Sequence, residues 1–223
     1  ENLGELLAQE FNPEDADVVT FLPRCPEVAA RSYAKKTDLT FLPVFYKVRG
    51  ERSFQGSTAS DRRKSIDDNL HLLPGLRPQL QGKTVVLIDD SIVRGNNSVR
   101  ARDLLYNEIG VKKAYLVSYT PPIGIVGADG EPRGCTFGVD MPPDPPAGEE
   151  FVARGRTNEQ ISERMGMPVV YLSNDLMLEA FRRAGVDDGH LCTYCIGGRH
   201  PLRHLGVESP AQDSMPQLEL LKV

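Results

Sequence analysis

Residues 85–98 read VVLIDDSIVRGNNS, and this stretch decides the fold. It opens with a short run of Val, Leu and Ile, which is typical of a buried β-strand. Two adjacent acids, Asp89 and Asp90, end the run, and a glycine and two asparagines follow before a helical pattern begins. Parallel sheets bind ligands at the carboxyl ends of their strands. The stretch therefore predicts a ligand site where this strand ends.

Short apolar runs of similar composition recur along the chain and predict further buried strands. They cover residues 17–22, 40–45, 84–89, 114–119 and 168–172. Helical patterns cover residues 1–11, 27–37, 98–110 and 174–185. Ser98 and Asn174 are the predicted N-caps of the last two helices, which Gly110 and Gly185 are predicted to end. Strands that alternate with helices predict an α/β fold, in which helices cover both faces of a mostly parallel sheet.

The composition favours a small polar ligand. The chain has 223 residues, which is enough for one domain with a hydrophobic core. Its net charge of −5 means that it has no overall positive charge to attract nucleic acid. No apolar run approaches the roughly 20 residues that a membrane span needs. The first residues also lack the charged region followed by an apolar region that is typical of a signal peptide. We therefore expect a cytoplasmic protein without membrane contact. The first residue is Glu rather than Met, which suggests a trimmed or processed chain.

The acid pair of Asp89 and Asp90 suits a phosphorylated sugar. Adjacent carboxylates can accept hydrogen bonds from vicinal hydroxyls or hold Mg2+, while loop N–H groups and a helix N-terminus can cradle a phosphate. Gly95 would let the backbone approach that phosphate. Side-chain hydrogen bonds to it could come from Ser91, Asn96, Asn97 and Ser98. The alternative is that the two acids form only a solvated turn.

The string DDSIVRG, residues 89–95, resembles the loop that binds phosphoribosyl pyrophosphate (PRPP) in type I phosphoribosyltransferases, and in particular the glutamine PRPP amidotransferase family. Three further segments resemble that family in the same order. Residues 47–63 are similar to its flexible loop, residues 134–142 to its Tyr-Gly-Ile-Asp-Met-Pro segment, and residues 192–201 to its C-terminal Cys-x-x-Cys run. The resemblance covers about residues 4 to 201 and implies the type I phosphoribosyltransferase fold.

The resemblance implies roles for particular residues. Asp89 and Asp90 would bind the ribose hydroxyls and Mg2+ of PRPP. The 5-phosphate would lie in the loop formed by Ser91, Ile92, Val93, Arg94, Gly95, Asn96, Asn97 and Ser98. Catalytic cations would come from Lys47, Arg49 and Arg52, which precede or enter the loop that closes over the pyrophosphate. Asp140 ends another short predicted strand, and it is equally well a solvated turn carboxylate.

The implied activity is that of a pentosyltransferase in purine synthesis, which converts PRPP and ammonia to 5-phosphoribosylamine. Such a displacement needs groups that position the substrates and neutralise the charge on the leaving pyrophosphate, rather than a nucleophilic side chain. The family's glutaminase half would precede the start of this chain, so ammonia would come from a separate glutaminase or from solution. We therefore expect one transferase domain at residues 1–202, a tail at residues 203–223, no glutaminase domain, and, by analogy, a homo-oligomer.

Most departures from the family pattern lie in the segments that contact pyrophosphate in the family. Family members have Pro-Asp-Ser-Gly in the first loop, whereas residues 23–26 read PRCP, so that Pro26 removes an N–H donor. The family's Thr-Thr is replaced by Asn96 and Asn97. In the flexible loop, Ala59 stands for a Gln and Asp67 for a Lys. These changes support a second hypothesis, in which the chain is a non-catalytic module that binds PRPP or nucleotides.

Cysteines provide the remaining candidate site. Cys192 and Cys195 form a C-x-x-C pair, and Cys135 matches a position where iron–sulfur members of the family carry a ligand. The resemblance therefore implies a [4Fe-4S] cluster, with zinc as the alternative. Cys25 is the other candidate ligand in the chain, although the family's fourth ligand lies upstream. A redox dithiol or unbonded cysteines remain open, and a cluster-bearing redox protein is the third hypothesis.

Overall fold

The computed structural model describes residues 1–47, 70–137 and 141–202. Several residues singled out in the sequence lie outside these ranges: Arg49, Arg52, Ala59, Asp67, Asp140 and the tail 203–223. Within the described ranges, no helix is long and apolar enough to cross a membrane.

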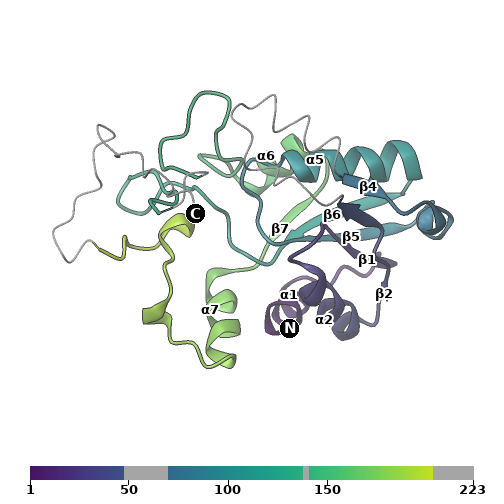
Figure 1. Ribbon diagram of the computed structural model, residues 1–223, viewed down its shortest axis with the longest axis horizontal. Helices are drawn as coiled ribbons and strands as arrows, with labels where there is room; N and C mark the ends of the chain where they lie inside the picture. The colour runs from purple at the N-terminus through teal and green to yellow at the C-terminus, as the bar shows by residue number, and fades with distance from the viewer. Residues whose placement is uncertain (48–69, 138–140, 203–223) are drawn as a thin grey trace, which may run out of the picture.

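Five of the described strands form one parallel sheet in the order β2-β1-β5-β6-β7 (Figure 1). These strands are β1 (Val18–Phe21), β2 (Thr40–Phe41), β5 (Thr84–Asp89), β6 (Lys113–Ser118) and β7 (Val169–Tyr171). Strand β5 lies in the middle, and all of its residues are buried. The predicted α/β fold with a parallel sheet is confirmed.

Helices cover both faces of this sheet, as Figure 1 shows. One face carries α1 (Asn2–Glu10), α2 (Glu27–Thr37) and α7 (Asn174–Arg183). The other carries α5 (Asn96–Asp103), the π-helix η2 (Leu104–Ile109) and α6 (Asn158–Met165). Shorter elements are η1 (Pro74–Leu76), α4 (Arg77–Leu80), η3 (Asp188–His190) and η4 (Tyr194–Ile196). The sheet thus separates two apolar cores.

A two-stranded antiparallel pair, β3 (Phe45–Lys47) and β4 (Leu70–Leu72), lies beside the main sheet and was not predicted. The single strand predicted at residues 40–45 is wrong in extent, because β2 ends at Phe41 and β3 begins at Phe45. Pro43 lies between the two strands, and proline cannot donate a ladder hydrogen bond. Because of this break, Lys47 lies at the end of a separate short strand, β3.

Two predicted helix caps are also wrong. Helix α5 begins at Asn96 with Gly95 as its N-cap, so Ser98 lies inside the first turn, where its buried hydroxyl faces Asp89. Helix α7 has Ser173, not Asn174, as its N-cap. The predicted C-terminal glycines are confirmed by their left-handed backbone, with φ of 78° at Gly110 and 81° at Gly185.

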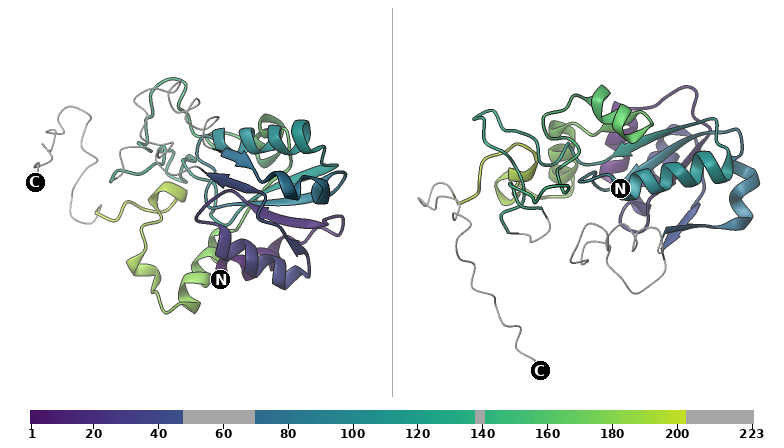
Figure 2. Two further views of the ribbon diagram at one scale, coloured as in Figure 1. Left: turned by 45° about the vertical axis from the view of Figure 1, so that its right-hand side comes forward. Right: turned by 90° about the horizontal axis from the view of Figure 1, so that it is seen from above.

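Residues 119–137, 141–157 and 186–202, called here the loop region, contain little regular structure. Their first and last parts lie together in both views of Figure 2, and the Gly124 N–H donates to the Cys195 carbonyl over 2.8 Å. The Arg154 guanidinium stabilises this region by donating to the carbonyls of Gly124, Arg133 and Pro143. One arginine thus joins two of these three segments beside the sheet.

Candidate active site

The order of the strands marks where a ligand would bind. From β1 the chain goes to β2 on one side, whereas β5, β6 and β7 follow on the other side of β1. The order in which successive strands are added to the sheet therefore reverses between β1 and β5. In open parallel sheets, the crevice outside the carboxyl ends of two such strands is the usual ligand site.

A cavity of about 370 Å³ lies at this point. It is lined by Leu22, Pro23, Arg24, Cys25, Lys47, Asp89, Asp90, Ser91, Val93, Asn97 and Met141. These residues come from the loop after β1, the end of β3, the loop after β5 and the loop region. Parts of the chain that were singled out separately in the sequence thus meet at one cavity.

Asp89 and Asp90 form the acidic floor of the cavity. Asp89 is only 6% exposed, and its carboxylate accepts hydrogen bonds from the Asp90 N–H at 2.9 Å and the Ser98 hydroxyl at 3.5 Å. The hydroxyl groups of Thr120 and Ser118 donate hydrogen bonds to the Asp90 carbonyl. Burial, and then the neighbouring Asp90 charge, raise the pKa of Asp89 well above its ordinary value. The Asp89 carboxyl therefore favours a bound proton or a cation beside it.

Mg2+ fits this pair. Mg2+ is commonly bound through one or two carboxylates and completes its shell with water and substrate phosphates, so Asp89 and Asp90 alone suffice. A cation there would replace the proton that burial favours on Asp89. Ribose hydroxyls are the other donors that the two carboxylates can accept.

Lys47 brings a positive charge to the same cavity from the end of β3. Burial lowers the pKa of its ammonium group, while Asp89, Asp90 and Cys25 act in the opposite direction. Arg24 lowers this pKa further, which places a second cation in the neighbourhood. Opposite charges therefore share the cavity.

The start of α5 supplies a place for a phosphate. Gly95, with φ of 80°, is the N-cap, and no side chain caps the first turn. The first N–H groups of a helix lack intrahelical acceptors and attract anions. The Oδ1 atom of Asn97, which lines the cavity, is buried without a hydrogen-bond partner. This orphaned acceptor requires a donor, such as a sugar hydroxyl, so the contact from Asn97 to a phosphate would come from its Nδ2 amide group.

The predicted phosphate loop divides into residues that line the cavity and residues that support it. Ser91, Val93 and Asn97 line it. The others lie elsewhere: Ile92 is in the core, Arg94 pairs with Glu149 at 3.3 Å, Gly95 and Asn96 start α5, and Ser98 contacts Asp89. Cys25, predicted as a possible metal ligand, lies in the cavity wall and is exposed.

Sequence reasoning missed three residues near the acid pair. Met141 lines the cavity from the loop region. Tyr119 follows β6, and burial together with Asp90, Cys25 and Asp89 raises its pKa. Tyr171 ends β7, and its buried hydroxyl has no hydrogen-bond partner, while burial and Asp89 raise its pKa. Both tyrosines follow or end predicted strands at the same sheet edge, which is a signal that the strand pattern already contained.

The three remaining cysteines lie in one neighbourhood of the loop region. Burial, then Cys192 and Cys135, raise the pKa of the Cys195 thiol. His200 connects the two segments, because its ring contacts Tyr194 and its Nε2 lies 2.9 Å from the Thr136 hydroxyl. Nevertheless, the described residues include no group of three or more His, Cys, Asp or Glu side chains that could hold a metal ion. The thiols as placed therefore do not fit a metal cluster, which stays a prediction of the resemblance.

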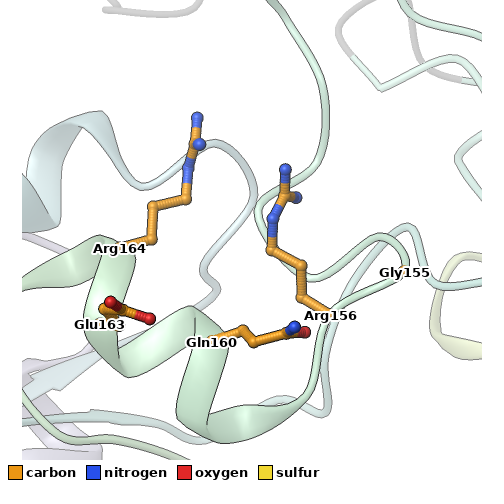
Figure 3. Close-up of a pocket in the computed structure, with 5 residues that line it drawn as sticks. All are labelled: Gly155, Arg156, Gln160, Glu163 and Arg164. Atoms are coloured by element: carbon orange, nitrogen blue, oxygen red, sulfur yellow. The ribbon is translucent and has the colours of Figure 1, made fainter.

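A second hollow, of about 390 Å³, is open and carries both signs of charge (Figure 3). It is lined by Gly155, Arg156, Gln160, Glu163 and Arg164. Figure 3 shows the two guanidinium groups projecting in the same direction, and Arg156 donates to main-chain carbonyls of the preceding segment. Although slightly larger, this hollow contains none of the predicted site residues and no acid pair, so the first cavity is the candidate site.

Solved structures with the same architecture define the class. The chain superimposes on a structure described as the allosteric regulatory enzyme of purine biosynthesis with a TM-score of 0.68 and 30% identity, over 90% of this chain and 40% of that one. It also matches glutamine PRPP amidotransferase of Bacillus subtilis, solved with ADP and GMP, with a TM-score of 0.65 and 29% identity, over 96% and 43% of the two chains. The chain has the fold of a type I phosphoribosyltransferase.

Sequence relatives identify the chain further. Amidophosphoribosyltransferase of Archaeoglobus fulgidus is 33% identical over 92% of this chain, and that of Bacillus subtilis is 32% identical over 90%. The chain spans 42% and 39% of these two proteins. No protein-family model matches it. The chain is a homologue of amidophosphoribosyltransferases and corresponds to their phosphoribosyltransferase region.

Proposed function

We propose that the chain binds PRPP with Mg2+ in the cavity at Asp89 and Asp90 and transfers its phosphoribosyl group to ammonia. The observation that carries this proposal is the meeting of an acid pair, in which Asp89 is buried, an uncapped helix start and the partly buried Lys47 at one cavity. The relatives' names support the choice of reaction. Because the chain spans about two-fifths of those relatives, the reaction is a proposal for this chain.

Each wall of the cavity has a task in this reaction. Asp89 and Asp90 accept hydrogen bonds from the ribose hydroxyls, and they would also hold Mg2+, which would supply positive charge for the leaving pyrophosphate. The start of α5 and Asn97 orient the 5-phosphate. Lys47 lies where it can stabilise negative charge on the departing group.

The step itself is a displacement at the anomeric carbon. The lone pair of ammonia forms the new C–N bond, the C–O bond pair leaves with pyrophosphate, and one proton passes to solvent. The product is 5-phosphoribosylamine. Ammonia would come from a separate glutaminase or from solution.

A second function rests on the loop at residues 23–26, which reads PRCP. Pro26 has no N–H to offer a pyrophosphate, and both Arg24 and Cys25 are exposed in the cavity wall. A protein with such a loop could hold the sugar phosphate without turnover. In that case the chain is a module that senses PRPP or a purine nucleotide, and ADP and GMP, found with the Bacillus subtilis relative, are suitable probes.

Pyrophosphate release separates the two functions. We expect the protein to release pyrophosphate from PRPP only when Mg2+ and ammonium are both present, as measured by a pyrophosphatase-coupled phosphate assay. Calorimetric binding of PRPP without any release would support the module instead. If neither release nor binding of PRPP, ADP or GMP is detected, both functions are excluded.

A metal at Cys135, Cys192 and Cys195 is a separate proposal that rests on the resemblance alone. No step of the proposed reaction depends on it. Iron and zinc contents of the purified protein, together with its visible absorption spectrum, test it directly.

A further inference from the structure

The hydroxyl group of Tyr171 is a buried donor without an acceptor. Tyr171 ends β7, is only 7% exposed and belongs to the same apolar core as Ile92 and Met165. Its hydroxyl has no hydrogen-bond partner among the described residues. Burying a hydroxyl group without a partner costs free energy, so each such group in a folded protein requires an explanation. We therefore looked for an acceptor near the end of β7.

The register of the sheet places Tyr171 in one row with Asp89. Asp89 on β5 is the register partner of Ser118 on β6, and Ser118 is the register partner of Tyr171 on β7. Side chains alternate between the two faces along a strand, so residues two positions apart share a face. The residues two positions before these three all belong to the core that α5 covers. Asp89, Ser118 and Tyr171 therefore share the face on which α5 lies.

Tyr171 can reach Asp89 along this row. Two strand spacings, roughly 9.6 Å, separate their backbones, and the small side chain of Ser118 lies between them. The Ser118 hydroxyl donates to main-chain carbonyls of Asp90 and Thr120, so it does not occupy the Asp89 carboxylate. Burial, and then the Asp89 charge, raise the pKa of Tyr171, which places this carboxylate in the electrostatic neighbourhood of the phenol.

The Asp89 carboxylate has room for another donor. A carboxylate offers about four lone-pair positions. The Asp90 N–H donates to it at 2.9 Å, and the Ser98 hydroxyl lies at 3.5 Å, which is long for two oxygen atoms. These two donors do not fill it. Carboxylates that hold a metal ion are usually oriented by further hydrogen bonds from behind, and Tyr171 is a donor in the right place for that task.

We infer that Tyr171 is a positioning residue for the acid pair: in the ligand-bound protein its hydroxyl donates a hydrogen bond to the Asp89 carboxylate and holds that carboxylate towards Mg2+ and the ribose hydroxyls. This inference rests on the proposed binding of PRPP with Mg2+. Tyr171 is not among the residues that line the cavity, so it acts through Asp89 rather than on the ligand. A hydroxyl that served only the fold would already be paired.

Tyr171→Phe removes only the hydroxyl group and keeps the ring in the core. We expect this variant to bind PRPP in saturating Mg2+ about 10-fold or more weakly by calorimetry, because a hydrogen bond to a charged group is lost. Without ligand, its thermal unfolding midpoint should equal or exceed that of the parent, because the substitution breaks no hydrogen bond and removes an unpaired buried group.

Tyr33→Phe is the matched control. Tyr33 is fully buried in the other core, and its hydroxyl donates to the Phe11 carbonyl over 2.8 Å. This variant should bind PRPP like the parent and unfold about 2–4 °C lower, because it loses a hydrogen bond that serves only the fold. The two tyrosine variants are therefore expected to differ in opposite directions in the two measurements.

An Asp89→Asn background tests whether the Tyr171 hydroxyl acts through Asp89. There the loss caused by Tyr171→Phe should shrink to about threefold, because a hydrogen bond to a neutral group is roughly half as strong. Three results would overturn the inference: an unchanged PRPP affinity in Tyr171→Phe, an equal loss in both backgrounds, or a midpoint lowered as far as that of Tyr33→Phe. Failure of the proposed function differs from all three, because the unsubstituted protein would then bind no PRPP.

Discussion

Combined Asp89→Asn and Asp90→Asn substitutions should lower the affinity for PRPP in Mg2+ at least about 100-fold, because two charge-assisted contacts are each worth roughly 1.5–3 kcal/mol. Both carboxylates line the cavity, and the neutral amides hold Mg2+ much less well. Calorimetry with PRPP measures the loss.

The same substitution at Asp89 should stabilise the fold at neutral pH. Burial raises the pKa of Asp89 in the folded protein, so the folded state binds this proton more tightly than the unfolded state does. Stability contributed by this group therefore falls as the pH rises from the unfolded pKa through the raised folded pKa. Asparagine carries no charge at any of these pH values, and its amide can still donate to the Ser98 hydroxyl. Each 1 kcal/mol gained corresponds to about 2–4 °C in the unfolding midpoint.

A second acid pair provides the matched control. Asp187 and Asp188 are adjacent, exposed and outside the cavity, so converting both to Asn makes the same change in net charge. That variant should bind PRPP like the parent and gain no stability. If the two double variants bind PRPP equally well, the assignment of the acid pair is wrong.

Gly95→Ala should weaken ribose 5-phosphate binding at least about 10-fold, since one or more charge-assisted hydrogen bonds to the phosphate would be lost. Gly95 has φ of 80°, a conformation that costs alanine roughly 1–2 kcal/mol. Its new Cβ would also lie 2.8 Å from the Sδ and Cε atoms of Met165, which is buried. Either the Met165 side chain or the loop must therefore move, and together with the backbone strain this would displace the first N–H groups of α5. Calorimetry with ribose 5-phosphate measures this effect.

Gly110→Ala separates backbone strain from the site. Gly110 has φ of 78°, and no atom lies within 4 Å of where its Cβ would be. It ends η2, the continuation of α5, outside the cavity. We expect Gly110→Ala to lose about 1–2 kcal/mol in free energy of unfolding, Gly95→Ala to lose at least as much, and only Gly95→Ala to lose affinity. An equal affinity in the two variants would contradict a phosphate site at the start of α5.

The sheet could be predicted because its strands are buried on both faces. In β5, Val85 and Leu87 pack into one core and Val86 and Ile88 into the other, which produces an uninterrupted apolar run. The acid pair was predictable for a related reason, since the strand register places it where that run stops. Local sequence therefore sufficed for the sheet and for the floor of the site.

Other parts depend on contacts that no local pattern specifies. Strands β3 and β4 have three residues each, too few for a periodic signal. Helix α6 buries only Ile161 and Met165 among its residues, so its apolar face is weak, although the capping box between Thr157 and Gln160 was a readable start signal. Met141 reaches the cavity from an irregular segment, and only the folded chain brings it there.

Protection of Cys25 tests most directly whether PRPP binds in this cavity. Cys25 lines the cavity and Cys192 does not, while both are free and exposed, so the two thiols can be compared in one sample. The rates of alkylation by N-ethylmaleimide would be followed by peptide mass spectrometry, with and without saturating PRPP and Mg2+. We predict that PRPP slows alkylation of Cys25 at least about 10-fold and leaves Cys192 unchanged, in keeping with an occupied site that excludes the reagent. Equal alkylation of Cys25 with and without PRPP, at a concentration where calorimetry shows binding, would contradict the account.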